Sequence, residues 1–485
     1  MLSIGESRSA VRLARQTSRL VEDPFSAAMS LGGILIDAGA QLGNRRLVAE
    51  GRALIESVGD DVPSEYRAAY HYNLGNGYAE TARFERGRGP WRRIANSRAI
   101  SELDESLRSK ESPDTRTNLA TSFRLQWRLF EALDEYETVL LQVPNHHQSV
   151  AMRAGCLVQL SHWLPQHAAL LLAAYQDYDR AVELAGADIV FADSYRKHRD
   201  ALARHVRHFP LETVTPSDYQ KWIWSSRLAL NPCPLCRVDT PAVFDLFPLQ
   251  GHFSAPRRSV PVDLVLDMVN RLCQGYATAR WHLYAAVSKH AVRESEHQVY
   301  VPTGSGAEFG LSSGLLMSAC TAFFSLLNNV AYAVNVYFRL GLAPQAVTLE
   351  SIWHRKDGAR SLPSTESDMR RRLYRTDNHG LTALFELTRS LERGKGRYSH
   401  LRELRHGIEH RLVLSHSSVP GAKSELTLVD RSTLEESAFA LGRVAKAAVW
   451  YFSAAVLHEE RRRARRAALA GEQIRHGTSP SVRRA

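Results

Sequence analysis

The sequence predicts an all-α protein in which an array of helices is followed by a second helical bundle. Apolar residues recur at spacings of three and four through the first 200 residues, and runs of β-branched residues are few. Eight prolines then interrupt residues 210–261, and the helical pattern resumes afterwards. We therefore expect a helical domain over residues 1–209, a packed connector over 210–261, a bundle over 262–470 and a disordered basic tail over 471–485.

Length and composition limit the class of protein. A chain of 485 residues predicts two or three domains, and 44% hydrophobic residues can form complete cores. Five cysteines are too few for a disulfide scaffold, and no apolar segment follows the basic start, so we expect a cytoplasmic protein. The net charge of +11 favours an anionic partner, although Arg supplies most of the cations and this bias alone is weak evidence.

The N-terminal domain contains a pattern of small and large apolar residues. If Pro144 closes a unit of 34 residues, the preceding residues place six side chains at packing positions: Leu119, Ala120, Phe123, Ala132, Tyr136 and Val139. Leu74, Gly75 and Tyr78 fit an earlier unit separated by an insertion near residues 83–93, and residues 151–185 fit a weaker third. These residues resemble tetratricopeptide repeats, which implies recognition of a partner protein. A plain helical bundle is the alternative.

The second half predicts several helices in order. Trp222, Trp224, Phe244 and Phe247 indicate that the proline-rich connector is packed. The expected helices are Val262–Val292, Leu315–Phe338, Leu381–Arg393, Tyr398–His416 and Leu434–Ala470, with a brief strand at Leu426–Val429.

One of these helices lies in a segment without charge. Residues 309–338 are 30 consecutive uncharged residues, which is long enough to span a bilayer. Asn328, Asn329 and Asn335 lie inside this segment, and amides are costly in lipid. We therefore expect a central bundle helix and no membrane partner.

Several kinds of site are disfavoured. Cys233 and Cys236 have the spacing of half a zinc site, and His252 is a possible third ligand, but no fourth is evident. The glycines at 304–306 and 394–396 lack the Lys-Ser/Thr of a phosphate loop, and no GxSxG elbow occurs. The sequence predicts neither a metal nor a cofactor.

The remaining candidate is a histidine-rich helix. Leu401, Leu404, Ile408 and Leu412 form one apolar stripe, and His406 and His410 stack on the opposite face. Arg405 lies beside the stripe, four residues before Glu409. An Arg followed by a His at this spacing should occur about seven times by chance in this chain, so a solvated helix face is the alternative.

Longer segments resemble a known superfamily. They are residues 228–236, 276–284, 315–338, 378–391 and 404–411. Together they resemble the HEPN superfamily, and a bacterial subgroup in which this domain follows tetratricopeptide repeats. Residues 405–410 match its signature of Arg, a polar residue, three residues and His, with His406 where Asn or Asp is usual.

The resemblance implies a metal-independent endoribonuclease, often dimeric, in which the RNA 2′-OH attacks the adjacent phosphate and leaves a 2′,3′-cyclic phosphate. Arg405 would hold the phosphate, His410 would transfer the proton, and His406 would orient His410 or the phosphate. Because catalysis needs both an acid and a base, we expect a composite site in a homodimer.

Further basic groups are available to guide RNA, and they are Arg370–Arg372, Arg393, Lys395, Arg397 and Arg461–Arg466. The architecture suggests a toxin-like role in phage defence or growth arrest. The alternatives are a HEPN module that binds RNA or a nucleotide without cleavage, and a scaffold in which the repeats bind proteins.

Overall fold

The computed structural model describes most of the chain, and its helices confirm the all-α class. The described residues are 4–18, 21–85, 90–163, 168–186, 188–206, 215–233, 260–288, 307–353, 376–394, 396–410, 413–416 and 427–469. The chain divides into two compact units, residues 1–210 with 233–235 and residues 211–232 with 236–485. The predicted tail, residues 471–485, lies outside the described residues.

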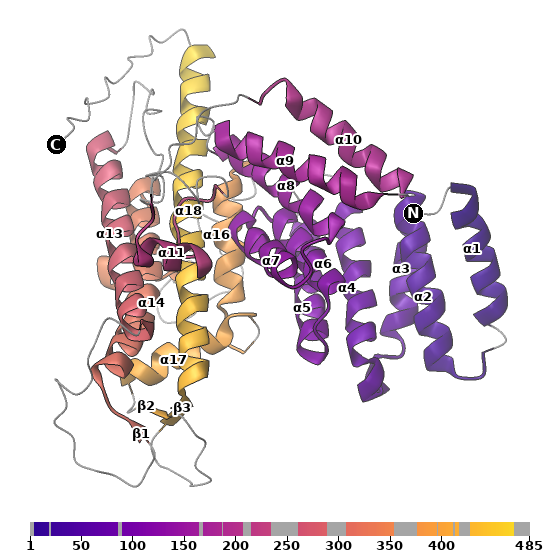
Figure 1. Ribbon diagram of the computed structural model, residues 1–485, viewed down its shortest axis with the longest axis horizontal. Helices are drawn as coiled ribbons and strands as arrows, with labels where there is room; N and C mark the ends of the chain where they lie inside the picture. Colours follow the sequence, from indigo (N-terminus) through magenta and orange to yellow (C-terminus); the bar gives the residue numbers. More distant parts are fainter. Residues whose placement is uncertain are drawn as a thin grey trace. The chain divides into compact units, whose positions relative to one another are not determined.

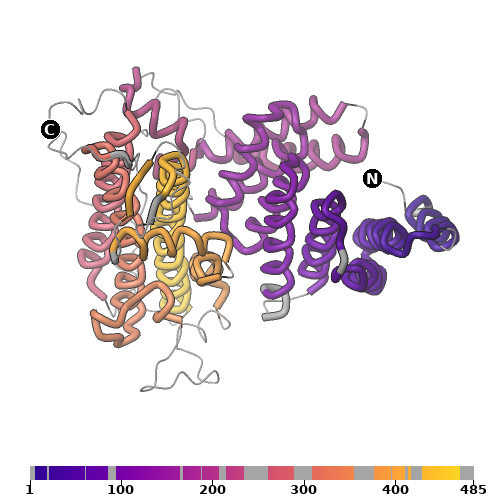
Figure 2. Tube along the Cα trace, turned by 90° about the horizontal axis from the view of Figure 1, so that it is seen from below, coloured from indigo at the N-terminus to yellow at the C-terminus, as the bar shows by residue number. Residues whose placement is uncertain are grey.

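The N-terminal unit is a run of consecutive helices. They are α1 (Ile4–Thr17), α2 (Pro24–Gln41), α3 (Arg45–Glu56), α4 (Arg67–Phe84), α5 (Pro90–Ser109), α6 (Pro113–Leu125), α7 (Leu129–Gln142), α8 (His147–Trp163), α9 (Ala168–Ala185) and α10 (Ile189–Ala203). Each helix packs on the next, and α2, α4, α6 and α8 also contact one another in that order. Figures 1 and 2 show these helices side by side. The arrangement is that of a two-layer helical array, and its identity as tetratricopeptide repeats stays a prediction.

Helices α6 and α7 contain the best-matched repeat unit. Ser112 caps α6 by accepting a hydrogen bond from the backbone N–H of Thr115, and Pro113 occupies the first turn, where no backbone donor is needed. All six predicted packing residues of this unit are completely buried. In the earlier unit, a Cβ on Gly75 would lie 2.7 Å from Cγ of Leu103, so glycine allows α4 and α5 to approach closely.

The second unit is a bundle around one long helix. It contains α11 (Asp218–Ser225), α13 (Val262–Val287), α14 (Leu311–Phe338), α16 (His379–Ser390), α17 (Ser399–His410) and α18 (Arg431–Leu469). Figure 1 shows α18 running between α13, α14 and α16, and it packs on all three. Every residue from Val444 to Leu457 is buried, so this part of α18 is enclosed on all sides where the sequence pattern predicted one apolar side.

Residues 227–230 attach the segment after α11 to this bundle through their backbone carbonyls. Lys446 Nζ donates to the carbonyl of Arg227 (2.7 Å), and Trp450 Nε1 donates to that of Leu230 (2.7 Å). The carbonyl of Leu228 accepts from both Tyr276 Oη (2.9 Å) and Arg280 Nη1 (3.0 Å). These bonds place the buried cations of Lys446 and Arg280 against carbonyl oxygens, which compensates for their removal from water. Of the predicted connector, the structure describes only residues 215–233 and 260–261.

The predicted helix Tyr398–His416 is wrong at its C-terminal end. Helix α17 ends at His410, and Val413–His416 is a strand, β2. This strand pairs antiparallel with β1 (Ala307–Glu308) and parallel with β3 (Thr427–Asp430). Pairing with β1, which is distant in sequence, and with β3 overrides the local helical pattern here, as it often does for short strands. The strand predicted at Leu426–Val429 is found one residue later.

Helix α18 begins directly after β3. The Asp430 carboxylate accepts hydrogen bonds from the backbone N–H groups of Ser432 (2.8 Å) and Thr433 (3.4 Å). Bonds to Ser432, first its hydroxyl and then its backbone, keep the pKa of Asp430 below its ordinary value. The cap therefore fixes where the central helix starts.

Candidate functional site

Helix α17 presents the predicted motif from a fixed position on the bundle. Leu401 is completely buried, Leu404 and Ile408 are half-buried, and the helix packs on α14. The turn before it is tight, because a Cβ on Gly396 would lie 2.2 Å from the carbonyl oxygen of Ser390. The structure thus has three of the four residues of the predicted apolar stripe buried or half-buried on α17, and the fourth, Leu412, lies outside the described residues.

Arg405 is engaged by two neighbours. Its Nη2 forms an ion pair with the carboxylate of Glu409, one turn further along α17. Its Cζ lies 5.2 Å from the centroid of the Phe324 ring on α14, which is the geometry of a cation–π contact. Its Nε is buried and has no hydrogen-bond partner among the described atoms. The guanidinium is therefore held in one place beside α14.

The two histidines of the motif lie one helical turn apart. His406 is exposed to solvent. His410 is the last residue of α17, and the described part of it is the backbone, so its imidazole lies outside the described groups. The structure brings Arg405 and Glu409 together, and the convergence of Arg405 with His410 stays a prediction.

The amino-acid sequence of residues 259–460 matches the family described as LA2681-like HEPN. These residues form a HEPN domain. The match spans α13 to α18 and includes the motif helix α17. Comparison with curated proteins and with solved structures gives no match. The predicted HEPN membership is confirmed for residues 259–460, and the tetratricopeptide character of the N-terminal helices stays a prediction because the match does not reach them.

Segments that resembled the superfamily in sequence meet in the HEPN domain. Asn378 donates through Nδ2 to the carbonyl of Ala455 on α18 (2.9 Å) and caps α16 by accepting from Leu381 N–H (3.1 Å). Leu228, which precedes the matched range, accepts from Tyr276 and Arg280 inside it. The HEPN domain therefore forms one unit with residues 215–232, which precede the family match.

Sequence reasoning missed one neighbour of the site, Phe324, and one buried histidine, His416 on β2. Phe324 is placed against Arg405 by the packing of α14 on α17, and no local spacing signals that contact. His416 on β2 is buried, its Nδ1 has no partner among the described atoms, and it pairs in register with Asp430. In the sequence, His416 follows Arg411 at the same spacing that separates Arg405 from His410, but this spacing occurs often by chance and Arg411 lies outside the described residues.

The arginine run at the end of α18 is partly paired. Arg462 bonds to Glu459 (2.7 Å), and Arg463 bonds to Glu460 (3.1 Å). Burial, followed by the nearby Arg465, lowers the pKa of Arg461. These pairs reduce the positive charge available to RNA. Arg393 is exposed on the surface, whereas Arg370–Arg372 and Lys395 lie outside the described residues.

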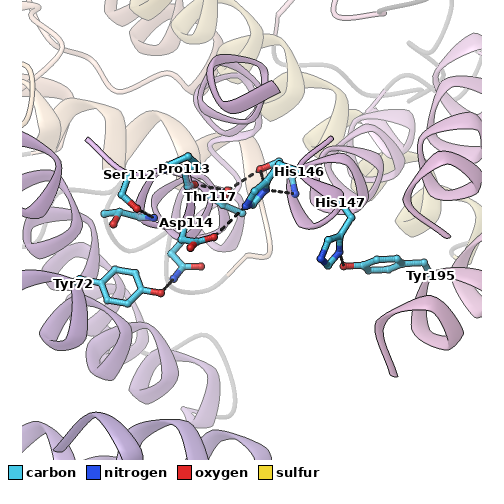
Figure 3. Close-up of polar contacts among 11 residues, drawn as sticks. Tyr72, Ser112, Pro113, Asp114, Thr117, His146, His147 and Tyr195 are labelled. Carbon is cyan, nitrogen blue, oxygen red and sulfur yellow. Dashed lines mark hydrogen bonds and ion pairs between the residues drawn. The ribbon is translucent and has the colours of Figure 1, made fainter. Parts of the chain in front are cut away.

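The N-terminal unit has a separate polar cluster, which Figure 3 shows. His146 Nδ1 accepts the backbone N–H of Ser149 (3.2 Å), so the ring proton is on Nε2, which donates to Asp114 on α6 (3.1 Å). His147 bonds to the Tyr195 hydroxyl on α10 (3.2 Å). Burial and the neighbouring His146 lower the pKa of His147 and keep it neutral. These bonds join α6, α8 and α10, which is a structural role.

Metal-binding and thiol chemistry gain no support in the described ranges. There, no group of three His, Cys, Asp or Glu side chains is placed to hold a metal ion. Cys236 and His252, two of the three candidate zinc ligands, lie outside those ranges. Burial raises the pKa of the Cys320 thiol to about 12, so this cysteine is a packed thiol and a poor nucleophile.

Proposed function

We propose that the protein is a metal-independent endoribonuclease of the cytoplasm, in which the HEPN domain cleaves RNA to 2′,3′-cyclic phosphate and 5′-hydroxyl ends. The observation that carries the proposal is the signature Arg405-His406-x-x-x-His410 on a bundle helix of a HEPN domain. Many members of this superfamily are ribonucleases. The partly exposed guanidinium of Arg405, backed by Phe324, supplies a cation for a phosphate at the surface of the domain.

Each motif residue has a role in this chemistry. Arg405 would donate to the non-bridging oxygens of the scissile phosphate and stabilise the charge that grows there. The 2′-oxygen forms a bond to phosphorus while the bond to the 5′-oxygen breaks. His410 would take the 2′-hydroxyl proton or give a proton to the leaving oxygen, and His406 would orient His410 or the phosphate.

We further propose that two copies combine to provide both the acid and the base. The solvent-facing side of α14 supports this, because it carries no charge. Its exposed residues are Leu311, Gly314, Ser325, Asn329 and Tyr332. Ser325 is adjacent in sequence to Phe324, which contacts Arg405. Pairing of two copies through α14 would thus bring two motif helices to one interface.

Incubation of the purified protein with total RNA in EDTA tests the proposal. We expect fragments with cyclic phosphate ends, and loss of these fragments in Arg405→Ala and His410→Ala. Arg402→Ala is the matched control for the cation, because Arg402 lies on the same helix and pairs with Glu350 at 3.2 Å. Cleavage that persists in both motif variants, or that stops in EDTA, would contradict the proposal.

The N-terminal helical array is proposed to bind a partner protein that directs or controls the nuclease. Its support is the layered packing of α2, α4, α6 and α8, since such arrays offer an extended surface for a partner. A pull-down that compares the full chain with a variant carrying substitutions on α4 and α6 would test whether the array binds a partner protein.

A further inference from the structure

The contact between Arg405 and Glu409 bears on how the site is controlled. We infer that Glu409 acts as an internal competitor of RNA, with its carboxylate occupying the position on Arg405 that a phosphate must take. This inference rests on the proposed function, because it assigns regulation to the same site. Glu409 lies inside the motif, between His406 and His410.

The chemistry of the guanidinium makes the competition direct. Arginine binds a phosphate through two parallel N–H groups on one edge, either Nε with Nη2 or Nη1 with Nη2. Nη2 belongs to both edges, and it is the nitrogen that Glu409 holds. Nε of Arg405 is buried, which closes the first edge to an incoming ligand. A phosphate that binds in the paired manner through Nη1 and Nη2 would therefore share Nη2 with Glu409 and lie beside its carboxylate, so the two anions compete for the same nitrogen.

The surroundings prevent Arg405 from avoiding Glu409 by moving. The Phe324 ring lies against the guanidinium. Leu401 and Gly407, on the same helix as Arg405, are buried. The side chains of Arg405 and Glu409 are 29% and 20% exposed, so solvent screens the pair incompletely. A phosphate approaching this position also meets the negative carboxylate, and like charges at this range repel. The resting site is thus closed by charge, and displacement of Glu409 opens it.

A charge-removing substitution tests the inference in the full-length protein. The probe is a fluorescein-labelled single-stranded RNA with 2′-O-methyl groups throughout, which cannot be cleaved. We expect Glu409→Gln to lower the Kd of this RNA by about tenfold at low salt, because it removes one competing charge. Cleavage of an unmodified RNA below saturation should rise by a similar factor.

Two further variants make the result specific. Glu403→Gln removes an exposed carboxylate from the same helix and should leave the Kd unchanged. Glu409→Asp shortens the side chain by one methylene and should lower the Kd by less than Glu409→Gln does. Circular dichroism of each variant confirms that the helices are retained.

The outcomes separate this inference from the proposed function. If Arg405→Ala weakens RNA binding but Glu409→Gln leaves the Kd unchanged or raises it, Glu409 positions Arg405 and the competitor role is wrong. If the parent protein neither binds nor cleaves RNA and Arg405→Ala changes nothing, the proposed function itself fails.

Discussion

Helices α14 and α18 have nearly the same sequence signal and opposite surroundings. Both are long and apolar enough to cross a membrane by length and composition. In the bundle, 89% of the most apolar window of α18 is buried, but only 44% of that of α14. Hydropathy therefore predicts that a surface avoids water, but it does not say which element covers that surface.

The polar residues of the two helices show the same difference. Helix α18 buries charged groups, and each has a partner in the bundle: Lys446 donates to the carbonyl of Arg227, and Glu460 accepts from the Tyr337 hydroxyl (2.8 Å). Helix α14 has no charged residue, and its outward side carries two large side chains, Leu311 and Tyr332, beside small residues and an amide. Helix α18 is covered by its own chain, whereas α14 keeps an exposed and uncharged face.

The largest expected effect is in the core of α18. Trp450→Ala should destabilise the HEPN domain by about 3–5 kcal/mol, because it leaves a cavity and removes the donor to the Leu230 carbonyl. Hydrogen exchange of α18 peptides in the full-length protein measures the change. Protection equal to that of the parent would show that α18 is not the core of the domain.

Substitutions of two glycines compare a buried helix surface with an exposed one. Gly380→Ala should cost about 1–3 kcal/mol, because its Cβ would lie 2.3 Å from the Ala455 nitrogen where α16 crosses α18. Gly314→Ala on the outward face of α14 should stabilise that helix by about 0.5–1 kcal/mol, since nothing described lies within 4 Å of its Cβ. Denaturant midpoints of the two variants measure the contrast, and equal shifts would contradict it.

A charge on the open face of α14 tests its proposed role. Ser325→Arg should change the free energy of unfolding by less than about 0.5 kcal/mol, because the residue is exposed. It should nevertheless convert a dimer to a monomer in light scattering after size exclusion. Thr278→Arg, exposed on α13, is the matched control and should keep the parent's oligomeric state. A dimeric Ser325→Arg protein would show that α14 is not the interface.

The smallest effect concerns pH at the end of α18. Burial, followed by the nearby Arg462, Arg461 and Arg465, lowers the pKa of His458, although Glu459 opposes this. The folded state therefore disfavours the proton, so the contribution of His458 is present above the ordinary pKa of 6.5 and is lost as pH falls below it. Unfolding of the parent and of His458→Gln between pH 7.5 and 5 measures this loss. A similar slope in both proteins would rule out His458 as the group responsible.

The fold was more predictable than the site. The apolar spacing around Phe123 and Tyr136 identified buried residues, because helix packing depends on local periodicity. The end of α17 was wrong, since β2 depends on strands from distant segments. The contact of Arg405 with Phe324 was likewise invisible, because the two residues are about 80 positions apart and meet only through packing. Contacts between residues far apart in the sequence form the site, and rules based on local spacing do not predict such contacts.

The carbonyls of residues 227–230 also determine where this protein can be divided. A fragment that started at residue 259, where the family match begins, would retain Arg280 and Lys446 but lose the oxygens to which they donate. Two cations would then be left in an apolar interior without acceptors. An expression boundary for the isolated HEPN domain therefore belongs ahead of α11, in the segment before residue 215.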